Sequence, residues 1–389
     1  MKIFETFTGI GAQHKALTNL QKQNLIKEFE IVGTSEWYIS AIIAYSLIHH
    51  KEKFLKFYKN NLQYNKEYFL EELNKHTYST DSKNPSNLLR IKEDILRKLY
   101  TANYINKNFG SILEVKGNIL PKNIDVLTYS FPCIDLSNAG LKKGLFNGNK
   151  SGLLWEIGRI ISEIKLNNRP KILLMENVPT LFNKFKDGWE KWKNILDKYG
   201  YNTYQVILNS SDFNSAQIRR RAFAISIKKD IKINNNFNLE KEILKTKVYI
   251  NYKKEKNKII KDIIDKKVDN KYYINKPYNI LKSTDGKSGA KFDLIDHSLY
   301  EMANRIYDIN YKSPTLTTSG KIKIWDKSKI REITEIESFQ LMGFTKEDYL
   351  NIDEYFTKGH KYRFSGNSIV VNVLESLFEI INNILKTKK

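Results

Sequence analysis

The only cysteine among the 389 residues, Cys133, directly follows a segment that is typical of a buried strand. Residues 125–129 are mostly β-branched, aliphatic or aromatic, and Pro132 ends the run. A thiol held at the end of a strand is placed like a nucleophile. A structural cysteine fits the same pattern, because a thiol also packs as a small hydrophobic group. The choice between these interpretations depends on the rest of the chain.

A glycine turn is a second candidate for chemistry. Gly9 and Gly11 lie between a predicted strand over residues 2–7 and a predicted helix over residues 13–23. Strand, glycine turn and helix in this order open a doubly wound nucleotide-binding fold, in which glycines let a ligand approach the backbone and the turn presents free amides. Two glycines in this spacing are weak support when taken alone.

Two glutamates also end predicted strands. Glu36 follows residues 29–35, where a carboxylate can accept hydrogen bonds from the ribose hydroxyls of an adenosyl cofactor or can be an ordinary surface group. Glu176 follows residues 171–175. Ligands of open α/β sheets bind at the carboxyl ends of the strands, so we expect the glycine turn, Cys133 and Glu176 at one edge.

A cluster of arginines at residues 219–221 precedes a predicted strand over residues 222–227. Guanidinium groups suit a phosphate, a base carbonyl or a nearby thiolate. The arginines therefore complete a set of groups that could bind and activate a nucleotide.

The elements that must position these groups alternate along the chain. Further helices are predicted over residues 39–49, 153–166, 189–199 and 369–385, and a further strand over residues 204–208. This alternation indicates an α/β fold with a mostly parallel sheet and helices on both faces. The last helix has one apolar face and should pack back onto the core. Residues 51–116, with helical patterning over 66–73 and 88–100, are expected to form a solvated insertion.

The net charge of +22 and the pI near 9.5 suggest a polyanionic partner. An AT-rich genome would also enrich lysine, but it does not force so large an excess of cations over anions. Residues 228–280 mix aromatic side chains with lysines, which suits a nucleic-acid surface as well as a lysine-rich linker.

Other classes of protein are disfavoured. A single cysteine rules out an intramolecular disulfide framework and a cysteine-rich zinc site, and the six histidines show no ligand spacing, so we expect no metal. The first residues lack an apolar signal region and no run of 18 apolar residues occurs, which predicts a cytoplasmic protein without a membrane span.

Together these segments resemble the motifs of the bacterial DNA (cytosine-5)-methyltransferases, the modification half of restriction–modification systems. The resemblance extends loosely to the CpG methyltransferases of mollicutes. The matching segments occur in the order of the family and cover residues 7–11, 36–37, 131–133, 176–178, 217–221 and 366–368.

The resemblance implies an S-adenosylmethionine-dependent methyltransferase fold, a Rossmann-like α/β sheet with a smaller target-recognition domain. The implied domains are a catalytic domain over 1–228, a target-recognition domain over 229–320, a hinge and small-domain remainder over 321–362, and a C-terminal helix over 363–389 that returns to the catalytic domain.

The implied chemistry is methyl transfer to C5 of a cytosine that has been flipped out of double-stranded DNA. Cys133 would add to C6 of the base, because C5 alone is too weak a nucleophile. Arg219 would favour the thiolate, and Glu176 in its acid form would protonate or hydrogen-bond N3. Arg221 would hold the cytosine O2. The glycine- and lysine-rich residues 137–151 would act as a lid.

The remaining site residues are also carried over from the family. The implied cofactor-binding residues are Phe7, Gly9, Gly11, Glu36, Trp37, Asn118, Pro132, Leu153, Asn367 and Ser368. The implied DNA-binding residues are Ser137, Asn177, Gln217 and Thr315, with Asn177 also orienting the turn after Glu176. Two residues depart from the family pattern: Asn118 stands where an Asp usually faces the adenine amino group, and Ile134 replaces a Gln.

Two alternatives stay open at this point. A tRNA cytosine-5 methyltransferase shares the fold, although the long variable region between Arg221 and Ser313 favours DNA. A catalytically silent DNA-binding protein is disfavoured because the candidate catalytic residues are all present. We further expect a monomer, with any cognate restriction endonuclease as a separate protein. The recognition sequence, CpG or another short site, cannot be decoded from these residues.

Overall fold

The structure is a computed structural model that describes residues 1–132, 136, 150–274, 280–283, 291–294, 305–325 and 329–386. Cys133, Ile134, Ser137 and nearly all of the predicted lid lie outside the described residues. The chain separates into two compact units. Unit 1 contains residues 1–208, 220–246 and 375–389, and unit 2 contains residues 209–219 and 247–374.

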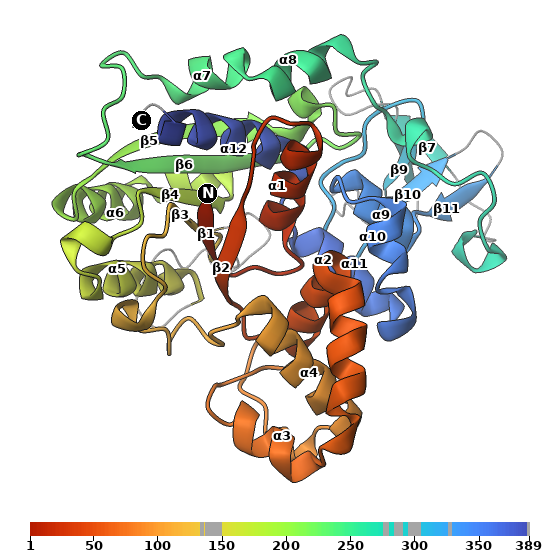
Figure 1. The fold of residues 1–389 in the computed structure, drawn as a ribbon. Coiled ribbons are helices and arrows are strands. Elements are labelled where there is room, and N and C mark those ends of the chain that lie inside the picture. The colour runs from red at the N-terminus through yellow and green to blue at the C-terminus, as the bar shows by residue number, and fades with distance from the viewer. Residues whose placement is uncertain are drawn as a thin grey trace. The chain divides into compact units, whose positions relative to one another are not determined.

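Unit 1 is built on a six-stranded sheet with the order β2-β1-β3-β4-β6-β5 (Figure 1). The strands are β1 Lys2–Thr6, β2 Glu30–Ser35, β3 Val126–Tyr129, β4 Ile172–Asn177, β5 Tyr201–Asn209 and β6 Arg220–Lys228. The first four run parallel, and β6 pairs antiparallel with β4. All four residues of β3 are buried, as expected for a strand covered on both faces. The predicted α/β fold is confirmed.

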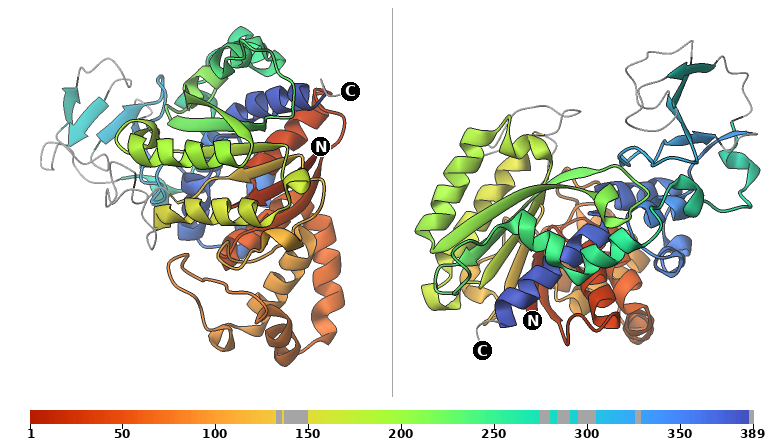
Figure 2. Two further views of the ribbon diagram at one scale, coloured as in Figure 1. Left: turned by 90° about the vertical axis from the view of Figure 1, so that its left-hand side faces the viewer. Right: turned by 90° about the horizontal axis from the view of Figure 1, so that it is seen from above.

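Helices cover both faces of this sheet. The helices of unit 1, not all of which contact the sheet, are α1 Ala12–Lys22, α2 Ile39–Asn60, α3 Lys66–Leu73, α4 Glu93–Asn106, α5 Leu154–Glu163, α6 Lys186–Lys198, α7 Leu239–Lys245 and most of α12 Val371–Lys386. Figure 2 shows α5 and α6 on one face, with α1 and α12 on the other. The last helix packs on the core as predicted, and its Glu375 accepts a hydrogen bond from Asn19 at 2.7 Å.

The segment 51–116 is not the solvated insertion that we predicted. Helix α2 continues to Asn60, and α3 and α4 pack beside it with buried apolar side chains. Phe54, Phe69 and Leu96 are at most 1% exposed. Apolar residues at helical spacing form a small core here, although lysines and asparagines dominate the composition.

Unit 2 contains a second sheet with the order β11-β10-β9-β8-β7. Its strands are β7 Ile280–Ser283, β8 Lys291–Leu294, β9 Arg305–Asp308, β10 Lys323–Trp325 and β11 Ile330–Glu332, and its helices are α8 Lys247–Lys254, α9 Glu335–Leu341, α10 Lys346–Leu350 and α11 Lys358–Asn367. Arg331 forms a buried ion pair with Glu337 at 2.7 Å. This pair ties β11 to the first turn of α9.

The division into units differs from the predicted domains. Residues 209–219 belong to unit 2, whereas residues 220–246 belong to unit 1, so the boundary at 228/229 is displaced. Helices α7 and α8 were not predicted, because their lysine- and asparagine-rich sequences show no sustained period.

One described stretch, Lys358–Lys386, is long and apolar enough to cross a membrane by length and composition alone. In the folded protein 78% of its most apolar window is buried, as in a core helix.

Candidate active site

The glycine turn that follows β1 has an unusual backbone. The φ angles are 55° at Phe7, 52° at Gly9 and 79° at Gly11, all in the left-handed region. Such a conformation is strained for Phe7, and strain of this kind clusters at functional sites. A Cβ added at Gly9 would meet no atom within 4 Å, so the turn faces open space on that side.

Glu36 fixes this turn to the end of β2. Its Oε2 accepts a hydrogen bond from the Gly9 amide at 3.0 Å, and its Oε1 accepts from the amides of Trp37 and Tyr38 at 2.9 Å. The Gly11 amide donates to the Thr8 carbonyl. The prediction of free amides is therefore wrong for both glycines, because the protein itself uses them. The turn instead offers space and an oriented carboxylate.

Asn108 is a site residue that the sequence did not reveal. Its side chain accepts a hydrogen bond from the Glu36 amide at 2.9 Å and donates to the Glu36 carbonyl at 3.0 Å. Ser35 donates to the Gly110 carbonyl at 2.9 Å, so the chain after α4 runs beside the end of β2. Only the long separation in sequence concealed this support, since asparagine after a helix is an ordinary residue.

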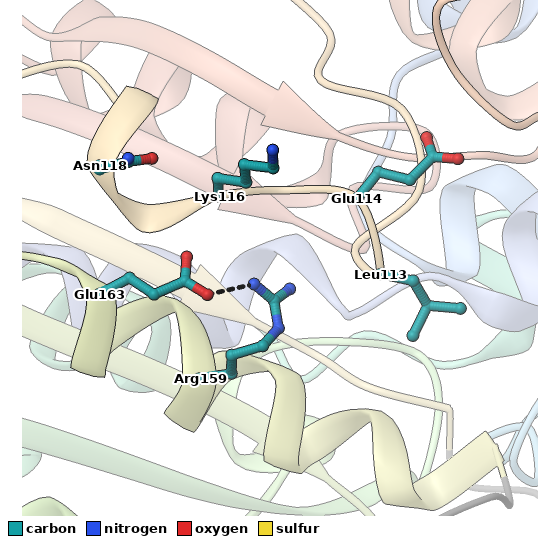
Figure 3. A pocket seen from close by; sticks show the side chains of 6 residues that line it. All are labelled: Leu113, Glu114, Lys116, Asn118, Arg159 and Glu163. Atoms are coloured by element: carbon teal, nitrogen blue, oxygen red, sulfur yellow. Dashed lines mark hydrogen bonds and ion pairs between the residues drawn. The ribbon is translucent and has the colours of Figure 1, made fainter.

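Asn118 lies elsewhere in unit 1. It is exposed and lines a pocket of about 510 Å³ with Leu113, Glu114, Lys116, Arg159 and Glu163 (Figure 3). The neighbouring Gly117 amide donates to Glu163 at 2.6 Å. Glu163 ends α5, which runs back toward the start of β4, away from the strand ends that hold the glycine turn. The structure thus does not support the prediction that Asn118 faces the cofactor.

At the carboxyl end of β4, Glu176 meets an arginine. The Arg221 Nε lies 3.2 Å from the Glu176 Oε1, and both side chains are largely buried. The antiparallel register of β4 and β6 brings them together, since Glu176 pairs with Phe223 and Asn177 with Ala222. A cation at this distance favours the ionised carboxyl group.

Asn177 connects the end of β4 to the segment that precedes Cys133. Its amide nitrogen donates to the Phe131 carbonyl at 3.0 Å, and its oxygen accepts from the Val178 amide at 2.8 Å. Asn177 is 2% exposed, and its contact with DNA stays a prediction. It does orient the turn after Glu176, as we expected, and it holds the end of β3 beside it.

Arg219 is bound to the backbone of unit 2. Its guanidinium donates to the carbonyls of Leu316, Gly366 and Ser368 at 2.8 to 3.1 Å, and the residue is 5% exposed. These partners all belong to unit 2. Backbone carbonyls therefore occupy the terminal nitrogens that were expected to favour the thiolate.

Gln217 and Thr315 also hydrogen-bond backbone groups of unit 2. Gln217 is fully buried, accepts from the Leu316 amide at 2.7 Å and donates to the Leu341 carbonyl, and its contact with DNA stays a prediction. Thr315 is half-buried and donates to the Ile218 carbonyl at 2.9 Å. A Cβ at Gly366 would lie 2.5 Å from the Thr317 backbone, so only glycine fits there.

The other predicted cofactor residues are distributed over both units. Trp37, Pro132 and Leu153 are half-buried in unit 1, and Leu153 precedes α5. In unit 2, Asn367 is exposed at the end of α11 and Ser368 is 9% exposed. Within the described parts of the chain, no group of histidine, cysteine or carboxylate side chains could hold a metal ion.

Comparisons with known proteins identify the family of the chain. A family model described as C-5 cytosine-specific DNA methylase matches residues 90–383. The chain is 38% identical over 400 residues to the orphan methyltransferase M.SssI of Spiroplasma monobiae, covering 98% of this chain and 97% of that protein. It is 32% identical to the type II methyltransferase M2.ScrFI of Lactococcus lactis subsp. cremoris, covering 97% and 98%.

A likeness of fold alone links the chain to the crystal structure of the S. pombe Dnmt2 methyltransferase. The TM-score is 0.63 at 17% identity, and the match covers 99% of both chains. The family match and the full-length relatives carry the assignment. The chain belongs to the C-5 cytosine-specific DNA methylase family and is a DNA cytosine-5 methyltransferase.

Proposed function

We propose that this methyltransferase uses S-adenosylmethionine to methylate a cytosine flipped out of a specific short site in double-stranded DNA, through a covalent bond between Cys133 and C6 of the base. The observation that carries the proposal is that side-chain contacts join the carboxyl ends of β3 and β4 and the start of β6. Asn177 holds the Phe131 carbonyl, two residues before Cys133, and the adjacent Glu176 pairs with Arg221.

The glycine turn fits the proposed cofactor. The space beside Gly9 would admit the methionine part, and the Glu36 carboxylate, oriented by backbone amides, would accept hydrogen bonds from the ribose. Phe7 and Gly11 shape the same turn. When bound, S-adenosylmethionine supplies a methyl group on a positively charged sulfur.

Further cofactor contacts are proposed for residues whose place in the family motifs matches. They are Trp37, Pro132, Leu153, Asn367 and Ser368. We leave Asn118 out of this set because of its place beside α5.

The thiolate of Cys133 would add to C6 and shift electron density to C5, which then attacks the methyl group. S-adenosylhomocysteine would be the leaving group of the methyl transfer. Loss of the C5 proton to water or hydroxide would then form the C5–C6 double bond, break the sulfur–C6 bond, and release 5-methylcytosine and the Cys133 thiolate. A single ordinary thiol is mostly protonated near neutral pH, so this step needs a local positive field.

Arg221 and Glu176 would act on the base during this addition. The Arg221 guanidinium would hold the cytosine O2, and Glu176 would hydrogen-bond or protonate N3 as negative charge develops there. The acid form of Glu176 belongs to the complex with the base, because the ion pair with Arg221 favours the carboxylate.

Base flipping is required because C6 is not accessible to a thiol inside a stacked duplex. The net charge of +22 suits the phosphate backbone, and Thr315 is the described residue proposed to contact DNA. By analogy with its type II relative, a cognate endonuclease would be a separate protein. We further propose that the enzyme acts in the cytoplasm.

The test is methylation of an unmethylated plasmid by the wild-type protein and by Cys133→Ala. We expect the wild type to incorporate labelled methyl groups into DNA and not into tRNA, and bisulfite sequencing should map them to one short site. Cys133→Ala should lose turnover but keep binding of DNA and S-adenosylmethionine. Near-normal turnover of this variant would remove Cys133 from the mechanism.

A further inference from the structure

A cluster of buried and half-buried polar side chains lies beneath the glycine turn, outside the groups that we assign to chemistry. It comprises Glu5 on β1, His14 on α1, and Tyr45, His49 and His50 on α2. Glu5 is fully buried, and Tyr45 and His14 are 1% and 8% exposed. So many polar groups in a core need hydrogen bonds, and the partners show what the cluster does.

The hydrogen bonds of the cluster run in one direction. Tyr45 donates its hydroxyl to the Glu5 Oε2 at 2.8 Å, so the Tyr45 oxygen accepts the bond of 2.9 Å from the Nδ1 of His14. Burial lowers the pKa of His14 well below its usual value, and the nearby His49, His50 and Lys15 lower it further. His14 is therefore neutral, with its proton on Nδ1.

His49 carries this arrangement to the backbone of the turn. Its ring stacks on His14 with the centroids 4.2 Å apart and an angle of 5°. Its Nε2 lies 3.0 Å from the carbonyl oxygen of Ile10, between the two glycines. A carbonyl can only accept, so His49 must carry a proton on Nε2.

The two glycines of the turn differ in how closely other atoms approach them. A Cβ added at Gly11 would lie 2.4 Å from the His49 Nε2 and 2.6 Å from the Tyr45 ring. The same atom added at Gly9 would meet nothing within 4 Å. The turn thus rests directly on His49 and Tyr45, while its other side is open to a ligand.

We propose that His49, held in place by His14 and Tyr45, is a positioning residue that fixes the Ile10 carbonyl and thereby keeps the glycine turn in the conformation that receives the methyl donor. This inference rests on the proposed cofactor site. His49 does not touch the reacting atoms, so its effect should fall on binding of S-adenosylmethionine and not on methyl transfer.

A matched pair of variants separates the hydrogen bond from the packing. His49→Phe keeps a ring stacked on His14 but removes the donor, whereas His49→Gln loses the ring and keeps an amide nitrogen near the position of Nε2. A net hydrogen bond corresponds to about a threefold to tenfold change in an equilibrium constant. We expect His49→Phe to weaken binding of S-adenosylmethionine by that factor, with kcat and the Kd for DNA nearly unchanged, and His49→Gln to recover most of it.

His50→Phe is the control. His50 contacts the His14 ring edge-on, with the ring centroids 5.1 Å apart, and lies at the kink of α2. Among the described residues, the hydrogen bond from this cluster to the Ile10 carbonyl comes from His49 and not from His50. We expect it to lower the melting temperature as much as His49→Phe does, without the loss of cofactor affinity.

Titration calorimetry with S-adenosylmethionine and melting curves of all three variants decide the matter. Normal cofactor affinity in His49→Phe, or equal losses in His49→Phe and His50→Phe, would overturn the positioning role. A wild-type protein that bound no S-adenosylmethionine would instead overturn the proposed function itself.

Discussion

Arg219 and Arg221 are two residues apart, yet they meet opposite kinds of partner. Arg219 donates to three backbone carbonyls in unit 2 and is almost completely buried, whereas Arg221 faces the Glu176 carboxylate at the end of β4. The first arginine holds backbone together, and the second stands beside a group that can act on a base. Two residues of one motif can thus have different roles, one structural and one chemical. The groups that each side chain contacts show which role it has.

Glu5 and Glu176 repeat this contrast on strands of the same sheet. Glu5 on β1 is fully buried and accepts a hydrogen bond from the neutral Tyr45 hydroxyl, and burial raises its pKa to about 7. Glu176 on β4 has a cation beside it. We therefore expect Glu5 to affect stability and Glu176, with Arg221, to affect catalysis.

The largest expected effect is on catalysis, in Arg221→Met. Removal of a donor that faces developing charge typically slows a reaction between about 10²-fold and 10³-fold. We expect a loss of this size in single-turnover methylation, together with some loss of stability, because the largely buried Glu176 carboxylate is left without its cation. Arg220→Met, an exposed position on the same strand, is the control and should retain the wild-type rate.

The next effect is a pH-dependent gain of stability in Glu5→Gln. The folded pKa of Glu5, about 7, lies above its ordinary value of 4.5, so the folded protein binds this proton more tightly than the unfolded chain. The wild type therefore loses stability as the pH rises from 4.5 through 7. Gln does not titrate, so its advantage should grow from about 1 kcal/mol at pH 5 to about 3 kcal/mol at pH 8. Urea unfolding at both values would measure it, and an advantage independent of pH would contradict this account.

The smallest of the three effects is a loss of stability in Arg219→Met. The change leaves the carbonyls of Leu316, Gly366 and Ser368 without these donors, so we expect the free energy of unfolding to fall by about 2 kcal/mol. Arg219→Lys should recover part of the loss. A variant with wild-type stability but methyl transfer slowed 100-fold would reverse the comparison and place Arg219 beside the thiol after all.

The sequence predicted those parts of the fold in which the pattern of apolar residues or a glycine turn is clear. The strands of the parallel sheet and the glycine turn after Thr6 were recognised because buried strands read as continuous apolar runs. Helices α7 and α8 were missed because lysine and asparagine obscure their apolar positions.

The site was predicted less completely, for a physical reason. Motif spacing identifies residue types at strand ends. It does not show which of their polar groups form hydrogen bonds within the protein and which face a ligand. Asn177 and Gln217 were assigned to DNA, although each side-chain amide already hydrogen-bonds backbone groups of the protein. The stack of His14 on His49 joins residues 35 positions apart, and nothing local in the sequence signals it.

The central claim is that Cys133 forms a covalent bond to the target base. DNA that carries 5-fluorocytosine at the mapped site tests it most directly, because fluorine at C5 cannot leave as a proton does and elimination is blocked after methyl transfer. With S-adenosylmethionine present, we expect a protein–DNA complex that survives denaturing electrophoresis, and none with Cys133→Ala. Tight binding of this DNA without a stable adduct would contradict the mechanism.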